Sequence, residues 1–254
     1  MTTGVLETEG DRLTSDPVPA HTLRQDVSRV LDTLEAGGVA VVGLDVAYAV
    51  IAMREAGIKR IFTAKNRSYE KPSGMFADWR LSRQIQKMDA DRHAMVREMI
   101  EQEGQPFSVV APFDASHPAF AKLEPFVLAS SSKAGTLDML LNAGQVHDEI
   151  AAQATERGIA VFGSSANTSL SGSKYTLQSV DTPVLEAADL TLDYGRSRYA
   201  NAEGRSSTII DFEDFTIIRV GVCFDRLVAA FKTRFDVDLT ITEATAMKPA
   251  NWRA

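Results

Sequence analysis

Short apolar runs that alternate with amphipathic segments are the feature that most restricts the fold of this 254-residue chain. Runs of this length suit buried strands, whereas apolar residues spaced three and four apart suit one face of a helix. Strands are predicted at residues 39–42, 107–111, 126–129, 137–141, from 159, and at 190–192, 208–212 and 215–220. Helices are predicted at residues 21–34, 47–56, 58–64, 85–103, 146–157 and 225–231. This mixed order predicts an α/β protein with a twisted mixed sheet and flanking helices.

The composition predicts one soluble domain in the cytoplasm. We see no internal repeat or low-complexity linker, so we expect a domain at residues 21–222, a flexible arm at 1–20, and a C-terminal helix and tail at 223–254. The arm lacks the apolar core of a signal peptide, and no apolar run reaches membrane-spanning length. The net charge of −7 argues against a chain-wide surface for nucleic acid or membranes, and a single cysteine excludes a cysteine-rich zinc site.

The stretch from Ile159 to Ser169 changes abruptly from apolar to small and hydroxyl residues. Ser165 and Asn167 are two apart, so in an extended or turning backbone they can face the same way. Small residues let a ligand approach the main chain, and the hydroxyl and amide groups supply directional hydrogen bonds. The pattern is compatible with a ligand site at the end of a strand, but taken alone it is more typical of an ordinary loop.

A cationic loop follows the helix predicted at residues 58–64. Lys65 and Arg67 are two apart, and Lys71 comes four residues later. Lysine binds phosphate as a point charge and arginine as a two-pronged donor, so this loop can hold a phosphate chain. The alternative for the segment by itself is a solvated basic loop.

Several familiar catalytic motifs are absent from the sequence. There is no glycine loop of the P-loop type, no dinucleotide fingerprint and no nucleophile elbow around Ser165. The four histidines lie far apart and lack metal-ligand spacing, so no metal site is predicted from protein residues. Catalysis by this chain would therefore rest on binding and orientation.

Read in order, the motifs resemble those of the YrdC-like family, whose best-known members are threonylcarbamoyl-AMP synthases. The matching features are listed here in chain order: Asp45 and Tyr48 after a strand, Lys65-x-Arg67, Lys71-Pro72, Ser165-x-Asn167, Ser207-Thr-Ile-Ile-Asp211 and Arg219-x-Gly221. The resemblance extends from about Leu23 to Gly221, which is nearly all of the predicted domain.

This resemblance implies a concave, positively charged surface and an adenylate-forming reaction. The family's synthases condense threonine, bicarbonate and ATP, with Mg²⁺ assisting, and release pyrophosphate at the start of a tRNA modification. It implies that Lys65 and Arg67 contact the triphosphate and act in catalysis, and that Asp45 and Tyr48 contact the small substrate. The nucleotide-binding residues it implies are Lys65, Arg67, Lys71, Ser165, Asn167, Ser207, Thr208 and Arg219.

The chain departs from the family pattern near the small-substrate residues. Leu44 and Val46 replace two threonines of the family's first strand motif, so hydroxyl groups that could orient an amino acid are lost. Residues 136–141 replace a strand in which the family carries an arginine, and they place an acid (Asp138) or an apolar residue where a cation is expected. The nucleotide residues survive better than the amino-acid residues, which predicts a nucleotide-binding relative with a different partner.

Three functions are compatible with this pattern. The first is an adenylate-forming transferase that acts on threonine or on another small amine or carbamate. The second is a non-catalytic regulator that binds a nucleotide or RNA, although the acidic balance weakens the RNA version because phosphate affinity needs several Lys or Arg contacts. The third is a carbamoyl or acyl transferase on the same scaffold. A dimer is compatible with all three, and so is a monomer.

Overall fold

One large mixed sheet organises the molecule. The computed structural model describes residues 12–68, 71–169 and 171–242, and its strands form an 11-stranded sheet. The strand order is β11-β10-β9-β4-β6-β3-β7-β2-β1-β8, with β5 paired to β6. The strands are β1 (Ala40–Gly43), β2 (Tyr48–Ala52), β3 (Gly74–Phe76), β4 (Phe107–Pro112), β5 (Ser132–Lys133), β6 (Thr136–Leu141), β7 (Phe162–Ser165), β8 (Leu190–Leu192), β9 (Ile209–Asp211), β10 (Thr216–Arg219) and β11 (Thr240–Ile241).

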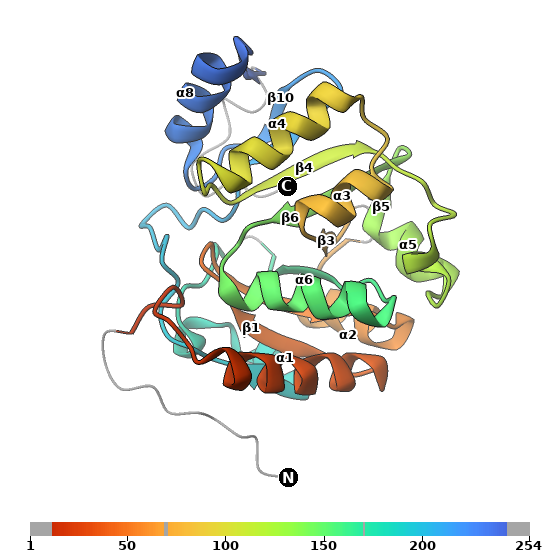
Figure 1. The fold of residues 1–254 in the computed structure, drawn as a ribbon. Helices are drawn as coiled ribbons and strands as arrows, with labels where there is room; N and C mark the ends of the chain where they lie inside the picture. The colour runs from red at the N-terminus through yellow and green to blue at the C-terminus, as the bar shows by residue number, and fades with distance from the viewer. Residues whose placement is uncertain (1–11, 69–70, 170, 243–254) are drawn as a thin grey trace.

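The helices lie on both faces of this sheet (Figure 1). They are α1 (Ala20–Glu35), α2 (Glu55–Ala64), α3 (Trp79–Ile85), α4 (Ala90–Glu101), α5 (Pro125–Ser131), α6 (Gln145–Arg157), α7 (Thr182–Glu186) and α8 (Phe224–Phe235), with short 3₁₀ turns at Pro118–Phe120 and Leu177–Ser179. The predicted class, a twisted mixed α/β sheet with flanking helices, is confirmed. Among the described helices, none has both the length and the apolarity needed to cross a bilayer.

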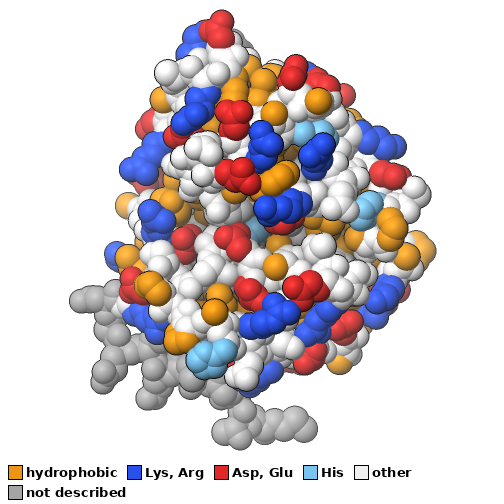
Figure 2. All heavy atoms as spheres, viewed as in Figure 1, with side chains coloured by type: hydrophobic (Ala, Val, Ile, Leu, Met, Phe, Trp, Pro, Cys, Tyr) orange, Lys and Arg blue, Asp and Glu red, His pale blue; other side chains and the backbone are white. Residues whose placement is uncertain are grey.

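Helices α1 and α6 lie side by side and cover one end of the sheet (Figure 1). Apolar residues of α1, including Val27 and Leu31, pack with Ile150 of α6 against alternate residues of β1 and β2. Across the outer surface of the pair, Arg157 on α6 forms ion pairs with Asp32 and Glu35 on α1, at 2.6 and 2.8 Å. Figure 2 shows the resulting mixture of positive and negative side chains on this side of the molecule.

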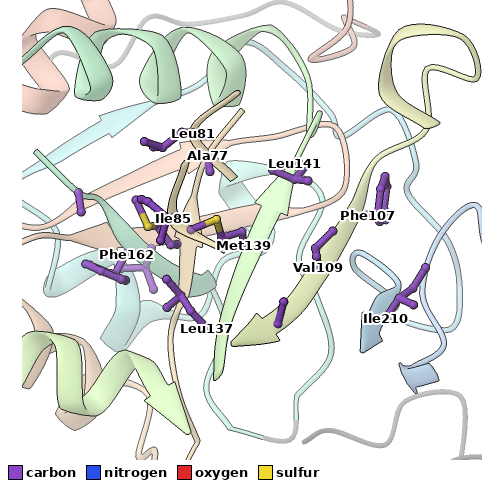
Figure 3. Packing of buried hydrophobic residues seen from close by; sticks show 14 of the residues in the cluster. Ala77, Leu81, Ile85, Phe107, Val109, Leu137, Met139, Leu141, Phe162 and Ile210 are labelled. Atoms are coloured by element: carbon purple, nitrogen blue, oxygen red, sulfur yellow. The ribbon is translucent and has the colours of Figure 1, made fainter. Parts of the chain in front are cut away.

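The opposite face of the sheet packs a second core beneath α3, α4 and α8. Met139 on β6, Val109 on β4 and Phe162 on β7 point into this core with Leu81 and Ile85 of α3 (Figure 3). Successive residues of a strand point to opposite faces of the sheet. In β4 and β6 every second residue is apolar and points into this core, so the residues between them point to the opposite face. That alternation decides where the polar residues of the site lie.

Three predicted elements are wrong. The segment predicted as a helix at 47–56 contains β2, and the strand predicted at 126–129 is part of α5. β2 is buried along its whole length between β1 and β7, and such an unbroken apolar run has no period that separates strand from helix. α5 begins at Pro125, and proline is favoured in the first turn of a helix. The single helix predicted at 85–103 is interrupted, because Asp89 caps a new helix through the backbone N–H of Arg92.

Part of the predicted N-terminal arm packs on the domain. The hydroxyl of Thr14 donates a hydrogen bond of 2.7 Å to Oδ1 of Asp45, and Leu13 pairs with Arg196 in a parallel bridge. The amide of Gln145 donates to the carbonyl oxygen of Thr14 at 2.6 Å. Residues 1–11 of the predicted arm and 243–254 of the predicted tail lie outside the described residues.

Candidate functional site

The strand register places a row of polar and small residues on one face of the sheet. Gly74 of β3 is paired with Gly163 of β7. On its other side β3 runs parallel to β6 with Met75 opposite Met139, so the preceding residues Gly74 and Asp138 lie beside each other. Asp138 is paired with Val110 of β4. Ser108 lies two residues before Val110 on β4 and therefore points to the same face. It is paired with Ile209 of β9, and Ile209 is paired with Arg219 of β10. Opposed residues share a face of a pleated sheet. We call this surface, carried by Gly74, Ser108, Asp138, Ser165 and Arg219, the polar face.

Lys65, the C-cap of α2, is buried beside the end of β7. Its Nζ donates hydrogen bonds to the carbonyl oxygens of Ser165 and, at 2.6 Å, of Asn167. The pKa of Lys65 is lowered to about 7, mainly by burial and then by the positive charge of Arg67, while Asp181 opposes the shift. The predicted Lys-x-Arg and Ser-x-Asn motifs are therefore in direct contact, although about a hundred residues separate them.

Arg67 lies in the loop after α2, with its guanidinium half-buried. Nε and NH2 donate to the carbonyl oxygens of Lys71 and Pro72 at 3.2 and 2.8 Å, and the group lies 5.8 Å from the ring centroid of Phe62. Burial lowers the pKa of Arg67 to about 10, and the nearby charge of Arg219 acts in the same direction. The loop is thus folded around Arg67, and Lys71 contributes to it through its main chain.

Asp181 accepts hydrogen bonds from residues that directly follow the Ser-x-Asn turn. Oδ2 of Asp181 accepts hydrogen bonds from the backbone N–H and the hydroxyl of Thr168 at 2.7 and 2.8 Å, and from Ser171 at 2.6 Å. Lys174 forms an ion pair with Oδ1 at 2.9 Å. Burial raises the pKa of Asp181, but these donors outweigh it and the net pKa is well below the usual range. Sequence reasoning missed this residue, which is in no motif and lies after the turn it anchors.

Ser207, Thr208 and Arg219 form the far end of the site. Nε and NH2 of Arg219 donate to the carbonyl oxygen of Ser207 at 3.0 and 2.7 Å, and NH2 reaches the Ser207 hydroxyl at 2.9 Å. The hydroxyl of Thr208 donates to the carbonyl of Val222 at 2.9 Å. The backbone at Gly221 packs directly against the backbone at Ser206, and a methyl group at Gly221 would lie only 2.3 Å from the carbonyl oxygen of Ser206.

Asp138 is the acidic residue on the polar face. Oδ1 of Asp138 is buried and has no hydrogen-bond partner among the described residues. Burial raises the pKa of Asp138 on balance, although the charge of Arg219, a hydrogen bond from Ser108 and the charge of Arg67 oppose this shift. The sequence identifies an acid at an unexpected position, and the structure places that acid in the field of two predicted phosphate-binding arginines.

Asp45 and Tyr48, the residues predicted to bind the small substrate, are both buried with protein partners. The Tyr48 hydroxyl lies 2.5 Å from Oδ1 of Asp193 and 2.8 Å from the carbonyl oxygen of Gly195. Burial, followed by the hydrogen bond to Asp193, raises the pKa of Tyr48 far above its ordinary value. The carboxylate of Asp45 faces Gly144, where a methyl group would lie 2.5 Å from its Cγ. Their role in substrate binding stays a prediction.

Three basic side chains lie on or beside the polar face. The charge of Arg67 acts on Lys65 and the charge of Arg219 acts on Arg67, and none of the three forms an ion pair with a carboxylate among the described residues. Within the described residues there is also no cluster of three or more His, Cys, Asp or Glu that could hold a metal ion. A divalent cation at this site would depend largely on oxygen atoms supplied by the ligand.

Comparison with known proteins gives one family and several similar folds. A family model for Sua5, YciO and YrdC, described as telomere recombination, matches residues 32–221. No curated protein shows a significant match to the chain.

The similar solved structures share the fold at low sequence identity. A hypothetical protein from Streptococcus mutans UA159 has a TM-score of 0.71 and 17% identity, covering 89% of this chain and 96% of that one. P. abyssi Sua5, solved with L-threonine, has a TM-score of 0.69 and 17% identity over 92% of this chain, which spans 62% of Sua5. Full-length HypF, in a phosphate- and nucleotide-bound form, has a TM-score of 0.54 and 11% identity, covering 78% of this chain and 24% of HypF.

Proposed function

Because this chain belongs to the Sua5/YciO/YrdC family, we propose that its polar face binds ATP and that the chain transfers the adenylate group to a small carbamate or related substrate. The observation that carries this proposal is that the charge of Arg67 acts on Lys65 and that of Arg219 acts on Arg67, while none of these three buried or half-buried basic groups has an ion-pair partner among the described residues. Shielded cations bind phosphate strongly because water screens them poorly. Solved relatives with threonine, or with phosphate and nucleotide, support the ligand classes.

In the proposed reaction, an oxygen of the substrate attacks the α-phosphorus of ATP. A new P–O bond forms as the bond to the bridging oxygen of the β-phosphate breaks, and pyrophosphate leaves with the electron pair. Lys65 and Arg67 stabilise the negative charge that accumulates on the phosphates, and Ser165 and Asn167 orient the nucleotide. Catalysis of this kind depends on positioning and electrostatic stabilisation, and a protein nucleophile is not needed.

We propose that Mg²⁺ enters with the nucleotide. Mg²⁺ commonly keeps several waters and uses one or two carboxylates together with substrate phosphates, which is compatible with the absence of a multi-carboxylate cluster in the described part of the chain. Its contribution would be to neutralise phosphate charge. Asp138 is the carboxylate nearest to this task on the polar face, but Arg67 and Arg219 disfavour a second cation beside it.

Pyrophosphate release tests the proposal. Purified protein is incubated with ATP, bicarbonate and Mg²⁺, with threonine and a panel of amines and amino acids, and products are identified by mass. Pyrophosphate and an adenylate product are expected with at least one partner. ATP binding without pyrophosphate release from any partner would contradict transfer and favour a regulatory nucleotide-binding role. A carbamoyl or acyl product without adenylate would indicate the third function.

A further inference from the structure

Residues 12–18, which we call the strap, pack against the loop that contains Asp45. Thr14 is the most buried residue of the strap, with 1% of its surface exposed, and its hydroxyl donates a hydrogen bond of 2.7 Å to Oδ1 of Asp45. The same hydroxyl accepts a hydrogen bond from the backbone N–H of Arg198 at 3.3 Å. Asp45 is itself only 6% exposed. The strap therefore occupies an oxygen atom of a residue that is predicted to contact the small substrate.

The loop that carries Asp45 is fixed and leads directly into the proposed nucleotide site. Leu44 and Val46, on either side of Asp45, are buried in the core beneath α1 and α6. The loop ends at β2, where the carbonyl oxygen of Tyr48 accepts a hydrogen bond of 2.8 Å from the backbone N–H of Ala166, within the Ser-x-Asn turn. Of the two partners in the Thr14–Asp45 contact, the strap is thus the one that can move.

Polar contacts hold the strap in place. The amide of Gln145 donates to the carbonyl oxygens of Thr14 and Asp16 at 2.6 and 2.8 Å, and its oxygen accepts from the backbone N–H of Val18 at 3.2 Å. A bridge to Arg196 adds two backbone hydrogen bonds of 2.8 and 2.9 Å. Within residues 12–18 only Thr14 is buried, so no fully buried apolar side chain anchors the strap. Segments with few buried apolar contacts open at a low cost in free energy.

The strap has an internal turn that does not depend on the rest of the domain. The backbone N–H of Leu13 donates to Oδ2 of Asp16 at 2.8 Å, and the backbone N–H of Asp16 donates to the carbonyl oxygen of Leu13 at 2.9 Å. The link to α1 contains the exposed residues Pro17 and Pro19, which have no N–H to donate. Release of the strap therefore breaks the contacts with Asp45, Gln145 and Arg196 and leaves the turn intact.

We propose that residues 12–18 are a detachable strap, which is released as one unit while the sheet stays folded, and that this release frees Asp45. Gln145 is the residue that holds the strap closed. The small substrate presents a hydroxyl or an amine to Asp45, so it competes with Thr14 for the same acceptor, and strap attachment excludes substrate binding. The detachment concerns the protein alone. The competition rests on the proposed function and on the predicted contact of Asp45 with the small substrate.

The first test is amide hydrogen exchange of the full chain, measured by mass spectrometry without nucleotide or substrate. In the wild type, peptides that cover the strap should exchange at least tenfold faster than peptides that cover β2. Gln145→Ala removes three hydrogen bonds to the strap, so it should accelerate strap exchange at least tenfold further and leave β2 unchanged. Gln84→Ala, at an exposed position of α3, is the matched control and should change neither rate.

Equal exchange rates of the strap and β2 in the wild type would overturn the detachment, because the strap would then open only when the sheet unfolds. Unchanged strap exchange in folded Gln145→Ala would overturn the role of Gln145. If Gln145→Ala does not fold, Thr14→Val takes its place, since valine has a similar shape and lacks the hydroxyl. This arm contains no ATP, so a failure of the proposed adenylate transfer leaves its result intact.

The second test measures the affinity for L-threonine by calorimetry, with and without ATP. Gln145→Ala and Thr14→Val should each bind threonine at least fivefold more tightly than the wild type, because both variants increase the fraction of molecules in which Asp45 is free. Gln84→Ala should bind threonine as the wild type does. Equal affinity in all four proteins, or binding by none of them, would overturn the competition at Asp45, even if ATP binds and pyrophosphate is released with another partner.

Discussion

The ammonium group of Lys65 lies 2.6 Å from the carbonyl oxygen of Asn167 and also bonds the carbonyl of Ser165. A single buried side chain thereby joins the end of α2 to the turn after β7. The contact has two consequences: the lysine fixes the shape of the turn, and its charge is available to a phosphate only while it stays protonated.

Lys65→Met should weaken ATP binding at least tenfold while the protein stays folded. Methionine has similar length but neither charge nor donors, so the turn loses its tie and the phosphates lose a cation. Calorimetric titration with ATP measures the change. Lys59→Met, on the exposed side of α2, is the matched control and should leave the affinity unchanged. An unaltered affinity in folded Lys65→Met would remove Lys65 from the site.

The free energy of unfolding should rise between about pH 7 and pH 9.5 through Lys65. Its pKa is lowered to about 7 in the folded protein from 10.5, so the unfolded chain binds more protons across this window and stability increases with pH. Each pKa unit corresponds to about 1.4 kcal/mol, so an increase on the order of 2–3 kcal/mol is expected. Denaturant unfolding at each pH measures it. In Lys65→Met the rise should be absent, and an identical rise in both proteins would assign it to another group.

Asp181→Asn should disorder the Ser-x-Asn turn. The carboxylate accepts three hydrogen bonds from Thr168 and Ser171 and pairs with Lys174, and the amide cannot accept them all. We expect a loss of about 1–3 kcal/mol in stability and a weaker ATP affinity. Because the pKa of Asp181 is lowered in the folded state, its contribution is complete above about pH 4 and is lost as pH falls further. Acid titration of the unfolding free energy, compared with that of Asp225→Asn, a control at an exposed position at the start of α8, checks this. A wild-type acid profile in Asp181→Asn would contradict it.

Tyr48→Phe should destabilise the protein by about 1–3 kcal/mol, because it leaves the buried Asp193 without its hydroxyl donor. ATP affinity should stay within twofold of the wild type, since the hydroxyl is directed to Asp193 and Gly195. Thermal unfolding and calorimetry measure the two effects. A selective loss of small-substrate affinity, with stability unchanged, would instead support direct substrate binding by Tyr48.

The family could be predicted from the short motifs in their chain order. The fold class and most elements could be predicted because long amphipathic helices such as α1 and α6 and the alternating strand β6 have clear periods. The prediction failed for β2 and α5, where burial on all sides or a helix-starting proline decides the structure. The family membership and the fold are confirmed by the family match and the similar structures. The roles of the individual site residues stay predictions.

Within the candidate site, residues in recognisable motifs were easier to predict from the sequence than the residues that hold the motifs in place. Lys65 and Asn167 stand in recognisable short patterns, but their contact depends on the pairing of β7 with β2 and β3. Asp181 has no motif, and its function follows from three-dimensional proximity to Thr168. The carboxylate of Asp138 could be noticed in the sequence, whereas its proximity to Arg219 required the register of β6, β4, β9 and β10.

The polar face crosses six neighbouring strands, from β7 through β3, β6, β4 and β9 to β10. Its residues are distributed along the chain from Gly74 to Arg219, so the face is incomplete until β9 and β10 have been synthesised and β9 has paired with β4. A ligand that spans this face would contact several strands in the middle of the sheet at once. It would recognise only fully assembled molecules, and its binding would protect the whole sheet, rather than one loop, from unfolding.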